Sequence, residues 1–143
     1  MNRQEFCKIL KCQREYKKIT KSDVARRIGE MFHVVDNIEK AKYSSNMNLI
    51  LRYVSAIEST LTLNGKQFST HEELVDLFKI ERKKSGTQDN FAKICGVSRV
   101  TVSKIENEQS SISVDVFLNM CTSLKIKIEI VNKECAIESK DQS

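Results

Sequence analysis

The order of apolar and polar residues repeats along the chain after 67 positions, without a gap. The shift places identical residues on each other: Ala25 on Ala92, Gly29 on Gly96, Val35 on Val102, and Ile38-Glu39 on Ile105-Glu106. Conservative apolar pairs, such as Leu61 with Ile128, keep the same phase between these identities. Since similarity at a fixed offset indicates a repeated structural unit, we predict two copies of one fold. The copies occupy residues 1–65 and 69–132, and a polar tail covers 133–143.

Helix signals occur at matching places in the two copies. Asn2-x-x-Glu5 and Ser69-x-x-Glu72 are capping-box patterns, and Thr20 and Thr87 are N-cap candidates for a second helix. Gly29 and Gly96 are suited to end that second helix in a left-handed turn. The expected helices are a first one over 2–18 and 69–84, a second one ending at the glycines, a third one over 31–40 and 98–108, and a fourth one over 46–58 and 113–123.

Each copy closes with alternating residues that are typical of a half-buried strand. Leu61 and Leu63 flank Thr62, and isoleucines alternate with charged residues over 126–130. Asn64-Gly65 predicts a hairpin with a return strand over 66–69. We expect the strands that close the two copies to pair in a small shared sheet.

Charge is distributed unevenly between the halves of the chain. The net charge is +5; residues 1–67 hold 13 Lys and Arg against 7 Asp and Glu, whereas residues 68–143 hold 11 against 12. A basic half favours contact with a polyanion such as nucleic acid. The polar segment 1–10 is not typical of a signal peptide, and no apolar run reaches the length of a membrane span, so we expect a cytoplasmic protein.

Residues that could support catalysis or metal binding are sparse. The five cysteines form no C-x-x-C pair, and Cys95 and Cys121 are expected to fill the core. The two histidines, His33 and His71, have no catalytic or metal partners in the sequence and are expected on the surface. The chain also has no glycine-rich phosphate loop and no paired carboxylate motif. We therefore expect no enzyme, no cofactor and no metal.

The segment 88–107, QDNFAKICGVSRVTVSKIEN, has the spacing of a helix, a sharp turn and a second helix. Ala92 is small where the helices would cross, Gly96 forms the turn, and Ser98 caps the next helix, which Val97, Val102 and Ile105 hold against the core. This segment resembles the Cro/repressor-type (XRE) helix-turn-helix family. The resemblance implies a mainly α fold of two tandem lambda-repressor-like units, each with four to five helices followed by a short β-strand.

The resemblance also implies roles for residues of the second copy. Gln88 matches the phosphate anchor, while Arg99, Val100 and Lys104 match residues that read base edges in the major groove. Further DNA contacts are expected from Ser98, Thr101, Ser103 and Asn107. Two departures from the family occur. Glu108 stands where the family usually has glycine, and Glu81 stands where an arginine usually pairs with the third-helix glutamate, here Glu106, so that pair is lost unless Arg82 substitutes. In the first copy the pair survives as Arg14 and Glu39.

The first copy departs further from the motif, with Met31 in place of the capping serine and with Glu30 and Asp36 near the expected groove. Its candidate DNA contacts are Lys21, Phe32, His33 and Asn37. Phe32 could touch a thymine methyl group and Asn37 could bind adenine. Alternatively, this copy no longer reads bases and only contacts phosphates through the lysines and arginines of its first two helices: Lys17, Lys18, Lys21, Arg26 and Arg27.

These observations predict a sequence-specific double-stranded DNA-binding transcriptional regulator, a repressor, that acts as an internal pseudo-dimer or as a homodimer. The alternative is an antitoxin or another protein-interaction module, in which Met31, Phe32 and Val34 of the first copy bind a partner such as a toxin. RNA binding is disfavoured because no aromatic stacking platform is visible.

Overall fold

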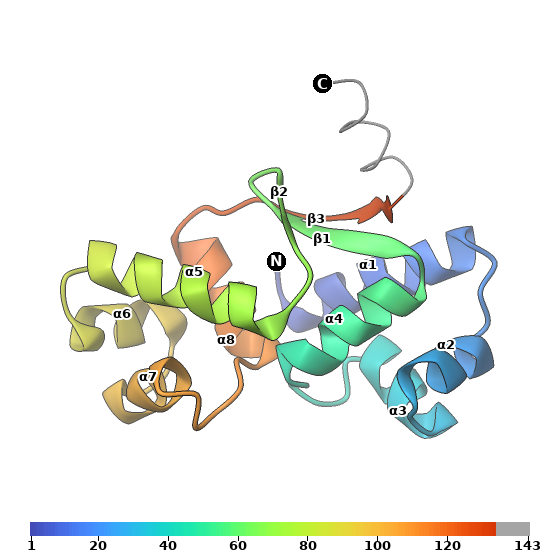
Figure 1. Ribbon diagram of the computed structural model, residues 1–143, viewed down its shortest axis with the longest axis horizontal. Coiled ribbons are helices and arrows are strands. Elements are labelled where there is room, and N and C mark those ends of the chain that lie inside the picture. Colours follow the sequence, from blue (N-terminus) through green and yellow to red (C-terminus); the bar gives the residue numbers. More distant parts are fainter. Residues whose placement is uncertain (134–143) are drawn as a thin grey trace.

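The computed structural model describes residues 1–133, which form eight helices and three strands (Figure 1). The first half contains α1 (Arg3–Tyr16), α2 (Lys21–Ile28), α3 (Phe32–Glu39), α4 (Met47–Ala56), β1 (Ser59–Leu63) and β2 (Lys66–Phe68). The second half contains α5 (His71–Lys84), α6 (Gln88–Cys95), α7 (Arg99–Glu106), α8 (Val114–Ser123) and β3 (Ile128–Asn132). The mainly α class is confirmed, whereas Cys135 and nearly all of the predicted tail lie outside the described residues. No helix within 1–133 is long and apolar enough to cross a membrane.

One small antiparallel sheet joins the two halves, in the strand order β2-β1-β3. β1 pairs with β3 from Ser59 opposite Asn132 to Leu63 opposite Ile128, so the expected pairing of the closing strands is confirmed. The hairpin at Asn64-Gly65 is also confirmed, since both residues have positive φ and β2 returns directly after them. β3 begins at residue 128, two residues later than expected.

A second junction, which the sequence analysis did not predict, brings the starts of α4 and α8 together. Asn46, the N-cap of α4, forms an isolated antiparallel bridge with Ser113, the N-cap of α8. The amide of Met47 donates to the carbonyl of Ile112 at 2.7 Å, and the amide of Val114 donates to the carbonyl of Ser45 at 2.8 Å. These bonds satisfy backbone donors that the first turn of each helix leaves free.

Local signals place most helix ends. Thr20 and Thr87 each accept a hydrogen bond from the third residue beyond them, and Gly29 and Gly96 each end a helix at φ +69°. The capping box of α5 is one residue later than expected: Thr70 and Glu73 form it, so the prediction of Ser69 and Glu72 was wrong. The first helix also ends earlier than expected, at residue 16, because Lys18 has a left-handed backbone.

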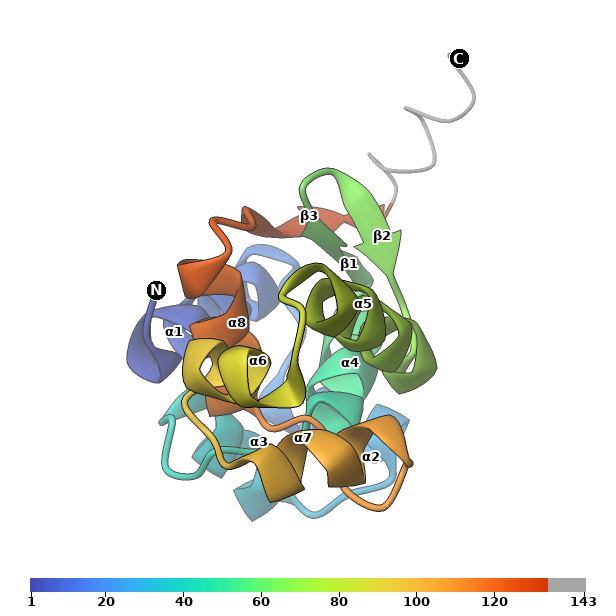
Figure 2. The ribbon, with the colours of Figure 1, turned by 90° about the vertical axis from the view of Figure 1, so that its left-hand side faces the viewer.

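The core runs through both halves and contains side chains from all eight helices of the described chain. Phe6 of α1 packs against Phe117 of α8, with ring centroids 6.1 Å apart, so aromatic contacts cross between the halves. Two views related by a quarter turn place the sheet on one side of the molecule and α3 and α7 on the opposite side (Figures 1 and 2). In Figure 1, α2 and α3 lie at one end of that side, and α6 and α7 lie at the other end.

Candidate nucleic-acid interface

The turn between α6 and α7 is built as the sequence predicts. Ser98 caps α7 by accepting a hydrogen bond from the amide of Thr101 at 3.2 Å. On the inner face of α7, Val102 and Ile105 are fully buried, and Ala92 of α6 is 5% exposed where the helices meet. Burial of two aliphatic side chains contributes roughly 3–6 kcal/mol toward holding α7 in place. The opposite face of α7 is therefore held in a fixed orientation toward solvent.

Gly96 is required in this turn for two separate reasons. Its φ of +69° is a conformation that side-chain-bearing residues rarely adopt. A Cβ atom at this position would also lie 2.9 Å from Nδ2 of Asn119, which donates a hydrogen bond to the carbonyl of Cys95 at 3.2 Å. Gly29, with the same φ, has open space where its Cβ would be. The turn before α7 is thus the more tightly packed of the two.

The outer face of α7 carries cationic, apolar and hydroxyl groups. Arg99 and Lys104 are exposed, and neither side chain has an ion pair or hydrogen bond with any of the residues 1–133. Val100 is 62% exposed. Thr101 and Ser103 are half-buried, and their hydroxyls contact Ser98 and Asn107, respectively.

The remaining predicted contacts of the second half lie at the start of α6 and at the end of α7. Gln88 is the first residue of α6 and is half-buried, and Asn107 is the exposed C-cap of α7. An anionic ligand that approached α7 would therefore meet two cations that have no partner in the described part of the chain, together with amide and hydroxyl groups.

Ion pairs tie the first helix of each half to its third helix. In the first half, Arg14 and Glu39 form a bidentate pair at 2.6 and 3.0 Å, and the hydroxyl of Tyr53 donates to Glu39 at 2.7 Å. In the second half, Arg82 binds Glu106 at 2.7 and 3.1 Å. Arg82 therefore replaces the arginine that is missing at position 81. The pair with Glu106 is kept, as the sequence analysis allowed if Arg82 substituted.

The start of α3 has Met31 and Phe32 where the start of α7 has Ser98 and Arg99. Met31 precedes α3 without any side-chain cap and is 69% exposed, and Phe32 is 52% exposed. The ammonium of Lys21 lies 5.8 Å from the centre of the Phe32 ring. His33 is exposed, and Asn37 is half-buried. The four predicted contacts of the first half thus lie on α3 and at the start of α2.

Several cations of the first half are engaged within the protein. Asp36 binds Lys21 at 2.8 Å and Lys40 at 2.7 Å, and hydrogen bonds from these two lysines lower the pKa of Asp36 to about 2. Arg27 donates to the carbonyl of Ala56. Lys17, an expected phosphate contact, instead binds Asn132 of β3 at 2.8 Å, beside the sheet.

Comparison with known families gives a match to part of the chain. Residues 78–131 match the Helix-turn-helix family model. The match begins within α5, contains α6, α7 and α8, and ends within β3. It supports the resemblance of this segment to DNA-binding regulators of the XRE type, and it does not extend over α1–α4. No curated protein and no solved structure matches the chain.

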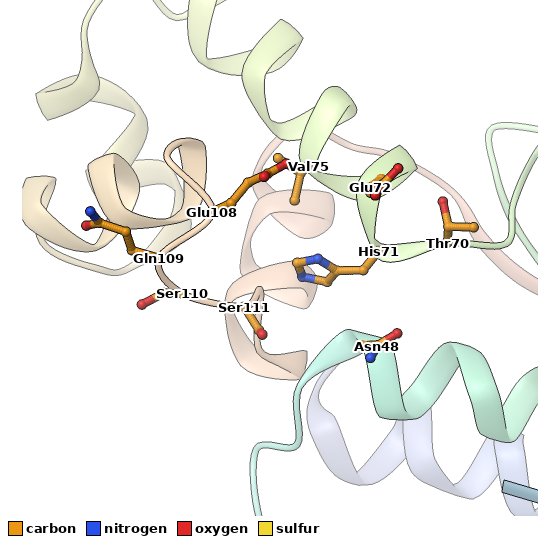
Figure 3. A pocket seen from close by; sticks show the side chains of 9 residues that line it. All are labelled: Asn48, Thr70, His71, Glu72, Val75, Glu108, Gln109, Ser110 and Ser111. Carbon is orange, nitrogen blue, oxygen red and sulfur yellow. The ribbon is translucent and has the colours of Figure 1, made fainter.

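A polar hollow lies between the helix-turn-helix segment and α4, lined by Asn48, the start of α5 and the loop after α7 (Figure 3). His71 is half-buried there, and its Nε2 accepts a hydrogen bond from the amide of Ile112 at 3.0 Å. Burial lowers the pKa of His71. The expectation of a plain surface histidine was therefore wrong for His71, because its partner is distant in sequence, whereas His33 is exposed as expected.

Cys95 of α6 and Cys121 of α8 fill the core, as predicted. Cys95 and Cys121 are at most 1% exposed, and burial raises the pKa of each thiol to about 12. They remain protonated and unreactive at neutral pH. Within the described residues, no group of histidine, cysteine or acidic side chains could hold a metal ion.

Proposed function

We propose that this protein is a sequence-specific double-stranded DNA-binding transcriptional regulator, a repressor, in which α7 reads base edges in the major groove. The observation that carries the proposal is the outer face of α7, where Arg99 and Lys104 are exposed and have no side-chain partner among residues 1–133. Unpaired cations on a helix that is fixed by its buried face suit a groove that admits one helix. The fork of Arg99 fits O6 and N7 of guanine, and Gln88, Ser98, Thr101, Ser103 and Asn107 add phosphate or base contacts.

We further propose that the chain is an internal pseudo-dimer of two tandem units, 1–65 and 69–132. Two junctions between the halves support this. Asn46 pairs with Ser113, and Thr62 pairs with Glu129, and in both cases the partners are 67 positions apart, which is the offset of the sequence repeat. A two-fold axis that exchanges the copies passes through pairs of equivalent residues, so both junctions are those expected of a symmetric dimer.

The hydrogen bonds around the Asn46–Ser113 junction support the same proposal. The bond from Met47 to Ile112 becomes the bond from Val114 to Ser45 when each residue is exchanged for its equivalent 67 positions away. In addition, α3 and α7 lie at opposite ends of one side of the molecule (Figure 1). Two reading helices on one side suit two half-sites about one helical turn apart.

The test is selection of duplexes from a random pool by the full chain, followed by affinity measurements on the selected site. Arg99→Ala should weaken binding roughly 5- to 150-fold, corresponding to about 1–3 kcal/mol, and relax the preference at one base pair. Lys104→Ala should also weaken binding. Lys66→Ala is a charge-matched control on the sheet side and should have little effect. Unchanged affinity for both α7 variants would refute the proposed reader.

The stoichiometry of the complex tests the pseudo-dimer separately. Sedimentation of the complex should give one chain per duplex, and the selected site should have two unlike halves. A site that requires two chains would instead show a conventional homodimer.

A protein-interaction role, such as that of an antitoxin, is the second candidate. The adjacent exposed side chains of Met31 and Phe32 favour it, since exposed apolar side chains often mark an interface, whereas Val34, the third residue of that interpretation, is half-buried. Failure to enrich any duplex in the selection would leave this role as the better one.

A further inference from the structure

Phe32 and Arg99 occupy the same position in the two halves. Each is the first residue of its helix, α3 or α7, and they are 67 positions apart. The N-terminal residues of a recognition helix are those that reach base edges. Because α3 and α7 lie on the same side of the molecule (Figures 1 and 2), a duplex that engages α7 and extends along this side faces α3 as well.

The surface around α3 has exposed apolar side chains at the start of the helix and lysine side chains near them and at the end of the helix. Phe32 and Met31 are 52% and 69% exposed, and neither can donate a hydrogen bond to a base. Lys21 and Lys40 both bind Asp36, which leaves this group of three side chains with a net charge of +1. Glu30, the second carboxylate near this surface, lies 3.7 Å from Arg52. Each of the two carboxylates that would repel phosphates therefore has a cationic partner, which reduces the repulsion of an approaching duplex.

This surface restricts what α3 can recognise. In the major groove, the 5-methyl group of thymine is the apolar feature that distinguishes one base from the others, and phenylalanine can contact it. Resting on the proposed function, we propose that α3 reads thymine methyl groups through Phe32. The DNA site then has a thymine-containing half under α3 and a guanine-containing half under α7, and a single chain binds it in one direction only.

The test uses the duplex selected by the full chain and removes single atoms or groups from its bases. Each thymine is replaced in turn by deoxyuridine, which removes only the methyl group, and each guanine by 7-deazaguanine, which removes the N7 acceptor. Affinities are measured for the wild type, Phe32→Ala, Phe32→Asn and Arg99→Ala. Ile80→Ala is the matched control, since Ile80 is 51% exposed but lies on α5 beside Phe68 of the sheet.

At one or two thymines, replacement by deoxyuridine should weaken binding by the wild type about three- to fivefold. This is the loss of affinity expected when one buried methyl group is removed. The same replacement should have no further effect on either Phe32 variant and its full effect on Ile80→Ala. Circular dichroism checks that both Phe32 variants are folded, and the replacements tested on the wild type alone do not depend on any variant.

The inference is overturned if the wild type is insensitive at every thymine, or if the sensitivity persists in both Phe32 variants. It is also overturned if the Phe32 variants weaken binding without any coupling to a thymine, since the side chain would then contact something else. The proposed function is tested by other readouts, namely the loss of affinity in Arg99→Ala and its coupling to a guanine. A failure at Phe32 is therefore distinguishable from a failure of DNA reading by α7.

Discussion

Alanine at each of the two equivalent glycines tests how tightly the turn before α7 is packed. Gly29 and Gly96 both have φ +69°, so alanine at either position has to adopt a left-handed backbone. That conformation costs about 1–2 kcal/mol. At Gly96 the new methyl group would also meet Asn119 Nδ2 at 2.9 Å, whereas at Gly29 nothing lies within 4 Å.

The excess cost at Gly96 follows from what Asn119 loses when it moves. Its amide would give up the hydrogen bond to the carbonyl of Cys95, which contributes about 0.5–1.5 kcal/mol. Gly29→Ala should therefore lower the free energy of unfolding by about 1–2 kcal/mol, and Gly96→Ala by about 1.5–3.5 kcal/mol. Urea unfolding monitored by circular dichroism measures both, provided that the slope of the transition is unchanged.

A third comparison separates the cost of the left-handed backbone at Gly96 from the cost of displacing the Asn119 side chain. In an Asn119→Ala background the obstruction is absent, so Gly96→Ala should then cost no more than Gly29→Ala. Equal costs for the two glycines in the wild type, or an unchanged excess at Gly96 without Asn119, would refute the reasoning.

Three further predictions concern stability. In urea unfolding, Glu39→Ala should cost about 3–5 kcal/mol and Glu106→Ala about 1–3 kcal/mol. The side chain of Glu39 is 2% exposed and pairs with Arg14 and the Tyr53 hydroxyl, whereas the side chain of Glu106 is 12% exposed. Equal costs would contradict this. His71 has a lowered pKa, so the stability it contributes is complete above its ordinary pKa and is lost as the pH falls through the folded value. The urea concentration at the midpoint of unfolding should decrease as the pH is lowered from 7 to 5, and the decrease should be smaller in His71→Ala. Glu108→Gly should raise the melting temperature, since Glu108 has φ +60°, and an unchanged melting temperature would show that this backbone carries no strain.

The sequence predicts this fold well where the signal is local. A hydroxyl at Thr20 or Thr87 and a glycine at Gly29 or Gly96 act on backbone groups within one turn, so spacing alone locates α2 and α6. The strand pairing of β1 with β3 followed from the repeat, because equivalent edges of two copies can pair across a two-fold axis.

Prediction fails where the sequence offers two registers or where the partner is distant. Ser69 and Thr70 are both capping residues, and both are followed three positions later by a glutamate. The choice of Thr70 accompanies the burial of Leu74, Val75 and Phe78, and which residues of α5 are buried is decided by the packed core. Likewise, Lys17 binds Asn132 across 115 positions, and a charge pattern along one helix contains no information about such a contact.

The pairing of β1 with β3 has a consequence for how the protein responds to its own abundance. Because both strands belong to one polypeptide, dilution cannot separate the halves, and their local concentration is set by the covalent connection. If one chain occupies the DNA site, as we propose, occupancy should follow a simple hyperbola in protein concentration, without the threshold that prior dimerisation would give. A regulator of this proposed kind would give graded control of transcription, and each half could change its DNA preference by mutation without altering the other.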